Sequence, residues 1–242
     1  MRQAGDTVKN LSLELGGHAP FIVTQSANLD LAVSQLIAPK FRNAGQTCMC
    51  PNRVFVHESV KDAFVERLVA AVQGMKVGNG LEEGVHIGPL INHAAVDKVH
   101  LHLQDALRNG ARLEHQHEQV PGSGYFVAPA VLSDVQESML CMREETFGPL
   151  VPVTSFSTVE EVVRRANNSR YGLAAYVFSQ DLKESFEICE GLEFGMIGLN
   201  DGQPTTAQAP FGGMKESGIG REGGHWGLDE YLEVKYVSMN LG

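Results

Sequence analysis

The chain has 242 residues, of which 43% are hydrophobic and 20% charged, enough to bury the core of one large domain or one domain plus an appendage. Its net charge is −10 and its Lys and Arg residues are dispersed, which disfavours nucleic acid and anionic membranes as partners. No signal-peptide pattern opens the chain, and no apolar run is long enough to span a bilayer.

Helical and strand-like segments alternate along the chain. Apolar runs and alternating patterns predict strands at residues 19–23, 53–57, 125–132, 150–156, 174–178 and 195–199. Helical spacing of apolar residues predicts helices at residues 28–40, 59–75, 92–108, 158–168 and 182–192. Strands joined by crossover helices form a parallel or mixed sheet covered on both faces, so the predicted fold class is α/β.

Three segments depart from this alternation. Residues 74–90 and 110–124 are rich in Gly, Pro and charge, and we expect them to be surface loops. Residues 231–240 alternate as a strand does, but no sequential partner follows them. They could add to the sheet of their own chain or to that of a neighbour, and we favour the neighbour because an unpaired strand edge needs cover.

Four cysteines stand at positions 48, 50, 141 and 189. They are too few for a secreted disulfide framework, which favours a reducing cytoplasm. Cys48 follows Gly45-Gln46-Thr47 at the end of a predicted helix, where a thiol could be nucleophilic or simply structural. Cys141 and Cys189 lie in apolar contexts typical of core residues.

Glu14 lies in an apolar strand-like stretch that ends in Gly16-Gly17. Burial there would raise its pKa and suit a general base, whereas a strand-end glutamate could also be solvated. A nucleophilic thiol and a base that activates water are the pair that acyl transfer through a thioester requires.

Two further blocks are candidates for ligand contact. Glu144-Glu145-Thr146-Phe147-Gly148-Pro149 could be a solvated turn, or its carboxylates could accept hydrogen bonds from ribose hydroxyls. Residues 209–222 contain four glycines and a proline, so we expect an irregular loop whose backbone can approach a ligand closely.

These four blocks, in this order, resemble the catalytic half of the aldehyde dehydrogenase superfamily over nearly the whole chain. The resemblance implies an open, mostly parallel sheet flanked by helices, with the dinucleotide-binding domain largely absent. It implies a remnant of that domain at residues 1–17, a catalytic domain at 18–230, and an oligomerisation strand and tail at 231–242. The small-molecule aldehyde substrate would be oxidised with NAD or NADP by a homo-oligomer.

The resemblance also implies residue roles. Cys48 would be the nucleophile and Glu14 the base for deacylation. Glu145 would hold the nicotinamide ribose, and Phe147 would lie against that part of the cofactor. Two further roles follow: Phe211 would line the substrate tunnel and Asn200 would support the catalytic loop.

Details around the cysteine resemble succinate-semialdehyde dehydrogenases. Arg42 could clamp a distant substrate carboxylate, because its planar guanidinium matches two oxygens, or it could cap the carbonyls of a helix end. Thr205 stands where those enzymes have a substrate-binding serine. Cys50 would form a reversible disulfide with Cys48 after oxidation, or would be an inert neighbour.

Departures and alternatives remain open at this point. Pro39 in the catalytic helix and Gln203-Pro204 differ from the pattern, and without a dinucleotide site we expect the isolated chain to be inactive as a dehydrogenase. Glutarate semialdehyde is the nearest competing substrate, and a non-catalytic fragment that acts only in association is the alternative from another class. We expect no metal site, because His100 and His102 face different ways on a predicted helix and are expected to be solvated.

Overall fold

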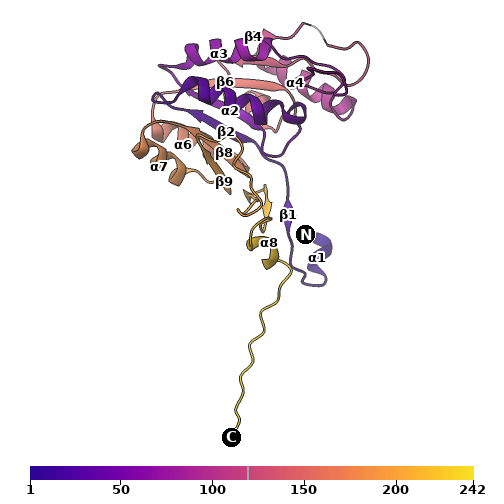
Figure 1. The fold of residues 1–242 in the computed structure, drawn as a ribbon, viewed down its shortest axis with the longest axis vertical. Helices are drawn as coiled ribbons and strands as arrows, with labels where there is room; N and C mark the ends of the chain where they lie inside the picture. Colours follow the sequence, from indigo (N-terminus) through magenta and orange to yellow (C-terminus); the bar gives the residue numbers. More distant parts are fainter. Residues whose placement is uncertain (119) are drawn as a thin grey trace.

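The computed structural model describes residues 1–118 and 120–242. A seven-stranded sheet forms its centre, in the order β4-β5-β6-β3-β2-β8-β9 (Figure 1). The strands are β2 (Ala19–Val23), β3 (Pro51–His57), β4 (Arg112–Gln116), β5 (Ala130–Ser133), β6 (Leu150–Phe156), β8 (Ala174–Phe178) and β9 (Met196–Leu199). All neighbouring pairs are parallel except β4 and β5, so the predicted α/β class and mostly parallel sheet are confirmed.

Five longer helices cover the sheet: α2 (Leu29–Phe41), α3 (Lys61–Gln73), α4 (His93–Arg108), α6 (Val159–Asn167) and α7 (Leu182–Gly191). Helices α2 and α3 pack together, as do α6 and α7. The crossover from β2 to β3 and that from β8 to β9 run in opposite directions along the sheet. Right-handed crossovers therefore place α2 and α7 on opposite faces.

Most predicted elements begin and end within a few residues of the observed ones, but two predictions are wrong. The segment 110–124 contains β4, which pairs antiparallel with β5, and is not a surface loop throughout. Strand β5 begins at Ala130 and not at residue 125. Strand β4 is an edge strand of mixed polarity, so its sequence lacks the apolar alternation that identified the other strands.

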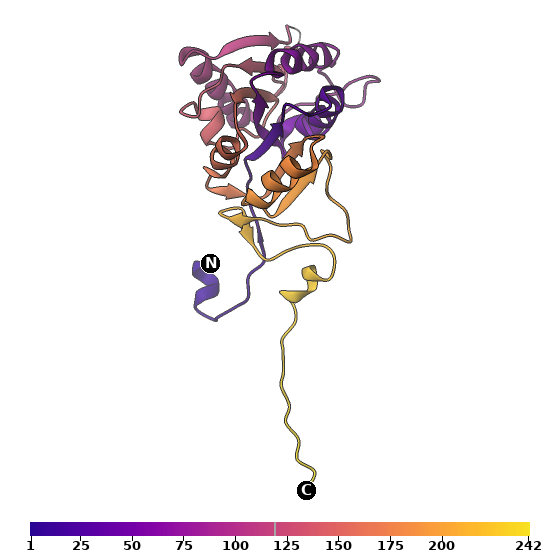
Figure 2. The ribbon, with the colours of Figure 1, turned by 90° about the vertical axis from the view of Figure 1, so that its left-hand side faces the viewer.

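Short elements extend below the main sheet. Strand β1 (Leu13–Glu14) pairs antiparallel with β11 (Gly218–Ile219), and β7 (Tyr171–Gly172) pairs with β10 (Met214–Lys215). The segment 209–222 is thus organised by two short ribbons, where the sequence predicted an irregular loop. Helices α1 (Arg2–Gly5) and α8 (Trp226–Asp229) lie beyond them (Figures 1 and 2).

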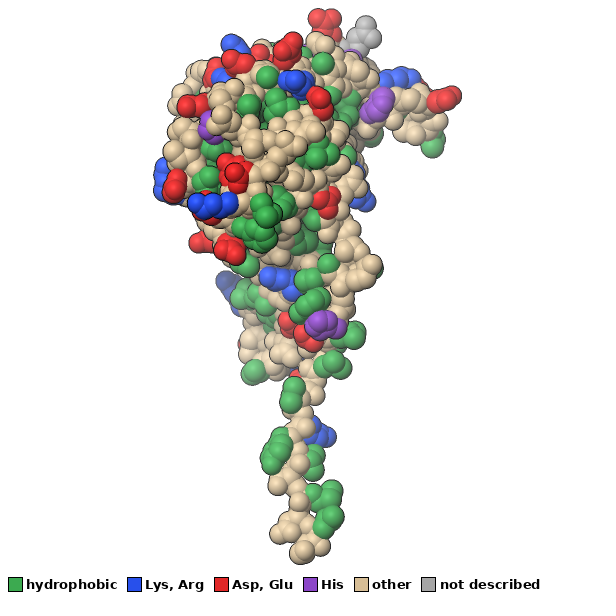
Figure 3. Space-filling view, turned by 60° about the vertical axis from the view of Figure 1, so that its left-hand side comes forward, with side chains coloured by type: hydrophobic (Ala, Val, Ile, Leu, Met, Phe, Trp, Pro, Cys, Tyr) green, Lys and Arg blue, Asp and Glu red, His purple; other side chains and the backbone are tan. Residues whose placement is uncertain are grey.

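Residues 231–242 run away from the body as an extended tail (Figure 2). Among the described residues no strand pairs with this tail, so addition to the sheet of its own chain is wrong. Hydrophobic side chains stand exposed along it (Figure 3), namely Tyr231, Leu232, Val234, Tyr236, Val237, Met239 and Leu241. Pairing with a neighbouring chain stays a prediction. No helix in the described ranges has the length and apolar character needed to cross a membrane.

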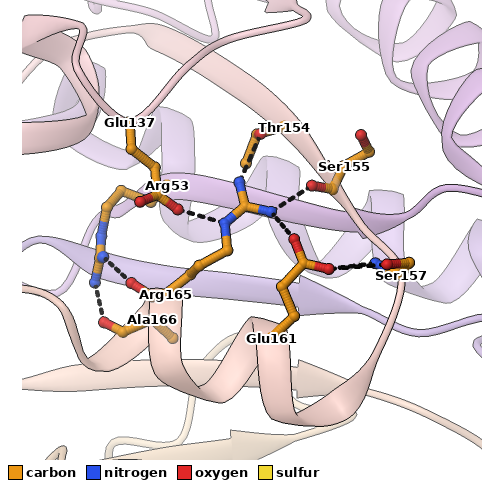
Figure 4. Close-up of polar contacts among 8 residues, drawn as sticks. All are labelled: Arg53, Glu137, Thr154, Ser155, Ser157, Glu161, Arg165 and Ala166. Atoms are coloured by element: carbon orange, nitrogen blue, oxygen red, sulfur yellow. Dashed lines mark hydrogen bonds and ion pairs between the residues drawn. The ribbon is translucent and has the colours of Figure 1, made fainter.

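The guanidinium of Arg53 ties β3 to helix α6 (Figure 4). Its side chain is fully buried and donates to the carbonyls of His18 at 2.9 Å, Arg165 at 3.3 Å and Ala166 at 2.8 Å. Arg165 in turn bonds Glu137 and Glu161, so a chain of charged groups lies between sheet and helix. A buried guanidinium that donates to three carbonyls is strongly held, because its removal would leave buried carbonyl oxygens short of a hydrogen-bond donor.

We expect Arg53→Met to lower the free energy of unfolding by about 3 kcal/mol, because it leaves buried carbonyls unpaired while keeping most of the side-chain volume. Urea denaturation followed by circular dichroism measures this change. The control is Arg164→Met on the exposed face of α6, which should stay within about 0.5 kcal/mol of the parent. Equal losses in the two variants would contradict the role of Arg53.

Candidate functional site

The segment that carries Cys48 turns sharply after α2. A short helical turn, η1 (Arg42–Gly45), contains Asn43 with a φ of 52° and Gly45 with a φ of 81°. Asn43 and Gln46 clamp the turn by exchanging side-chain to carbonyl hydrogen bonds of 3.1 and 2.9 Å. A Cβ on Gly45 would lie 2.4 Å from the carbonyl oxygen of Gly148, so only glycine fits this left-handed position. The turn sends the following residues back toward the sheet.

Cys48 and Glu14 line one cavity of about 430 Å³. The other residues of its wall come from α2, the turn and two distant loops; they are Pro39, Arg42, Gln46, Thr47, Met49, Phe147, Gly202, Gln203 and Thr205. The cavity therefore collects a thiol, a carboxylate, a guanidinium and a hydroxyl. Helix α2 continues through Pro39 to Phe41, and Arg42 still reaches the cavity wall.

The thiol of Cys48 is protonated near neutral pH. Its partial burial raises the pKa to about 12, and Glu14 adds to this shift as a hydrogen-bond acceptor and a negative charge. The backbone N–H groups of Cys48 and Met49 act in the opposite direction. The Glu14 side chain is exposed, so the burial predicted for this carboxylate is wrong. A carboxylate beside the thiol is well placed to accept its proton, and two N–H donors are placed to stabilise a developing anion.

Gly16 and Gly17 bring three segments together at this site. A Cβ on Gly17 would lie 2.1 Å from the carbonyl oxygen of Cys48, so the linker between β1 and β2 touches the thiol segment directly. The N–H of Gly17 donates to Glu145 at 2.9 Å, and the carbonyl of Gly16 accepts from Ser217 at 2.8 Å. Glycine at these positions permits an approach that no side chain would allow.

Glu145 lines a second cavity of about 550 Å³ on the other side of β1. Side chains alternate along a strand, so Leu13 and Leu15 face this second cavity while Glu14 faces that of Cys48. The second carboxylate oxygen of Glu145 lies where a Cβ on Gly16 would come within 2.9 Å of it. Burial raises the pKa of Glu145, and the N–H of Gly17 partly offsets that shift. This oxygen can accept a hydrogen bond from a ligand hydroxyl.

Phe147 lines the cavity of Cys48 and has a φ of 55°, an uncommon conformation for an aromatic residue. The structure therefore places Glu145 and Phe147 on two adjoining cavities. Thr146, which lies between Glu145 and Phe147, anchors this segment through a hydrogen bond of 3.1 Å between its hydroxyl and the ring of His102. His102 is fully buried, so its expected solvation is wrong.

Two predicted site residues lie away from the thiol. Phe211 is not among the residues that line the cavity of Cys48; it packs against the hydrophobic core and pairs with Glu222 through hydrogen bonds of 2.7 and 2.6 Å. The predicted place of Phe211 in a substrate tunnel stays a prediction. Asn200 bonds the backbone of Ser179 through both atoms of its amide, at 3.1 and 2.8 Å. It holds the end of β8, and it makes no direct contact of this kind with the thiol segment.

Cys50 points away from the cavity and is fully buried. Its sulfur contacts Nζ of Lys40 at 3.5 Å, and both residues lie in the core between α2 and β3. All four cysteines are free thiols. Tyr176 donates to the carbonyl of Met49 at 2.8 Å and so holds the chain between the two cysteines from β8. No sequence pattern identified Lys40 or Tyr176 as supports, because each becomes a neighbour of the thiol segment only in the fold.

Within the described residues, no group of three His, Cys, Asp or Glu side chains could hold a metal ion.

A sequence profile described as the aldehyde dehydrogenase family matches residues 1–237. The chain is 48% identical over 98% of its length to a probable succinate-semialdehyde dehydrogenase (NADP+) of Sinorhizobium fredii, covering 48% of that protein. It is 48% identical to a 3-sulfolactaldehyde dehydrogenase of Pseudomonas putida, with 98% and 49% coverage. A crystal structure of succinate-semialdehyde dehydrogenase from Burkholderia pseudomallei matches with a TM-score of 0.96 and 51% identity, with 98% and 49% coverage. The chain spans about half the length of the curated relatives it matches.

We expect Glu14→Gln to lower the pKa of the Cys48 thiol, because it removes the negative charge that opposes thiolate formation. The pH profile of Cys48 alkylation by iodoacetamide should shift to lower pH, with a rise of about 10-fold in rate below the pKa for each pKa unit lost. Glu190→Gln, on the exposed side of α7, is the control and should leave the profile unchanged. A profile that does not move in Glu14→Gln contradicts the proximity of the two groups.

We expect Gly17→Ala to displace the Cys48 segment, because the new methyl would overlap the Cys48 carbonyl. The free energy of unfolding should fall by about 1–3 kcal/mol, the usual range for forced overpacking. Gly74→Ala is the matched control: its Cβ meets only ordinary contacts, and the loss of chain entropy in the unfolded state should make it neutral or slightly stabilising. Thermal melts of both variants, read with Cys48 alkylation rates, measure the difference; a Gly17→Ala variant that matches Gly74→Ala would refute the contact.

Proposed function

The chain belongs to the aldehyde dehydrogenase family, and on that premise we propose that the full protein oxidises a small aldehyde with a carboxylate at its far end. Succinate semialdehyde is the proposed substrate, and NAD or NADP is the proposed electron acceptor. The observation that supports this most directly is the sharing of one cavity by Cys48, Glu14, Arg42 and Thr205. A thiol, a carboxylate, a cation and a hydroxyl in one cavity suit a short molecule with two different ends.

The substrate is positioned by its carboxylate. The Arg42 guanidinium offers a planar pair of N–H donors to two carboxylate oxygens, and Thr205 offers a hydroxyl. Because the Arg42 side chain is exposed at the rim, water screens its charge and its selectivity comes from hydrogen-bond geometry more than from long-range attraction. The aldehyde carbon then lies toward Cys48, and holding the two reacting groups in one cavity makes the attack effectively unimolecular.

Acyl transfer follows from the groups in the cavity. Glu14 accepts the thiol proton as the Cys48 sulfur attacks the aldehyde carbon, and the backbone N–H of Cys48 stabilises the oxyanion that forms. When bound, the oxidised nicotinamide supplies the hydride acceptor that converts this adduct to a thioester. Glu14 then takes a proton from the water that attacks the thioester carbon and releases the acid.

The residues present fit the ribose end of the cofactor. The free oxygen of Glu145 faces the second cavity beside Gly16, where a side chain would obstruct a ligand, and can accept from ribose hydroxyls. Phe147 would lie against the nicotinamide from the cavity of Cys48. We also propose that the 242 residues by themselves do not reduce NAD or NADP, since Glu145 and Phe147 would contact only one end of a dinucleotide.

The remaining parts of the proposal concern assembly and context. The exposed apolar residues of the tail at 231–242 support a homo-oligomer in which this segment pairs with a neighbouring chain. Four free thiols support a reducing compartment, which we take to be the cytoplasm. Glutarate semialdehyde, one carbon longer, is the second candidate substrate, because the same cation and hydroxyl would serve its carboxylate. A non-catalytic fragment has less support, since Cys48 and Glu14 face one cavity.

In the full-length protein, we expect Arg42→Met to lower kcat/KM for succinate semialdehyde by about 100-fold, or roughly 3 kcal/mol, through loss of the charged hydrogen bonds to the carboxylate. Acetaldehyde has no carboxylate, so its kcat/KM should change little in the same variant. Initial rates of NADH or NADPH formation with succinate semialdehyde, glutarate semialdehyde and acetaldehyde measure the effect. The proposal fails if the parent enzyme prefers acetaldehyde, or if Arg42→Met lowers both rates equally.

A further inference from the structure

Lys40 and Cys50 form a buried pair beneath the thiol segment. The Lys40 side chain has no exposed area, and its Nζ donates to Sγ of Cys50 at 3.5 Å and to the amide oxygen of Asn52 at 3.0 Å. The Cys50 thiol is equally buried and lies 3.8 Å from the carbonyl oxygen of Lys40. The two residues thus contact each other through both side chain and backbone, ten positions apart in the sequence.

A lysine is seldom buried without a carboxylate partner, because removing its ammonium from water is costly. Burial lowers the pKa of Lys40, and burial also raises the pKa of Cys50, against an opposing effect from Lys40 itself. Both directions favour an uncharged amine beside a sulfur atom. The uncharged form of the amine, which burial favours, has a free electron pair, and Nζ lies at 3.5 Å from the sulfur with which it would react once that sulfur is oxidised.

We propose that Lys40 and Cys50 become covalently joined through a bridging oxygen, as a nitrogen–oxygen–sulfur link, when the chain meets hydrogen peroxide. The 3.5 Å between Nζ and Sγ supports this linkage over a direct bond. One N–O and one O–S bond span most of that gap. A direct N–S bond would require two buried segments, α2 and the start of β3, to move much closer together in a close-packed core.

The chemistry balances with two equivalents of peroxide. The first oxidises the Cys50 thiol to a sulfenic acid, forming the S–O bond and releasing one water. In the second step the sulfenic oxygen bonds Nζ of the neutral amine: one proton leaves the oxygen and one leaves the nitrogen. The two electrons removed reduce the second peroxide to two waters. The sulfur and nitrogen together lose four electrons, and three waters form in all.

The link differs from the disulfide that the Cys48 and Cys50 spacing predicts. Cys48 lines the cavity, while Cys50 faces the opposite way into the core. Oxidation at Lys40 and Cys50 therefore leaves the Cys48 sulfur free. It also fixes helix α2, which ends at Phe41, to strand β3, which begins at Pro51 directly after Cys50. Because Cys50 is buried, its oxidation needs local opening and should be slower than that of Cys48.

The test is peptide mass spectrometry of the 242-residue chain after graded exposure to hydrogen peroxide, with and without later dithiothreitol. We expect a tryptic peptide in which Lys40 is joined to Cys50. Its mass should equal the sum of the two parts plus one oxygen and minus two hydrogens, and the reductant should reverse it.

Three variants separate the outcomes, each checked for folding by circular dichroism. Cys48→Ser removes the disulfide and must still give the Lys40–Cys50 link, whereas Cys50→Ser and Lys40→Arg must abolish it. Lys40→Arg keeps a long side chain with nitrogen donors at this position but lacks a reactive primary amine. A Cys48–Cys50 disulfide with free Lys40, a sulfinic acid on Cys50 with free Lys40, or no change at Cys50 would each overturn the proposal. The Cys48→Ser result stands even if a core variant does not fold.

Discussion

The absence of a side chain at Gly17 is the constraint on which the site depends. Only there can the linker from β1 approach the carbonyl of Cys48 closely enough to leave Glu14 beside the thiol. The same residue uses its N–H to hold Glu145, so Cys48, Glu14 and Glu145 are fixed relative to one another by one peptide unit. Distances among three groups from different parts of the chain are therefore set by backbone contact, which is stiffer than contact between long side chains.

This arrangement also gives the two cavities different side chains. Alternation along β1 sends Glu14 to one side and its leucine neighbours to the other, and Phe147 stands on the Glu14 side. The price of keeping a carboxylate beside the thiol is a high thiol pKa, which keeps the sulfur protonated and less prone to oxidation at rest. In the proposed mechanism, the sulfur becomes reactive when its proton passes to Glu14 as the aldehyde is attacked.

The sequence could predict elements with strong local signals. Residues 19–23 form an uninterrupted apolar run, and Asn28 caps the following helix, so β2 and α2 were predicted to within a residue or two. Strand β4 was missed because its pairing is non-local and its residues are polar. The blocks around Glu14, Cys48 and Glu145 were recognised as motifs, yet no pattern could place Lys40 or His102 in the core. Both are residue types that usually remain in water, and only tertiary packing overrides that preference.

The parallel strands β2, β3 and β6 all begin at the edge of the sheet where Cys48 lies, so the crossover helix α2 ends there. The carboxyl end of a helix carries the negative pole of its dipole, which attracts cations and repels anions. Arg42 caps this end and is therefore stabilised before any ligand arrives. An anionic molecule at this edge is repelled by the carbonyl groups of the helix end, whereas a helix start would attract it with N–H groups. The positive charge of the Arg42 guanidinium opposes this repulsion. In the proposed function, recognition of a substrate carboxylate at this edge therefore depends on Arg42 for its charge, and a single codon change can remove that charge without disturbing the sheet.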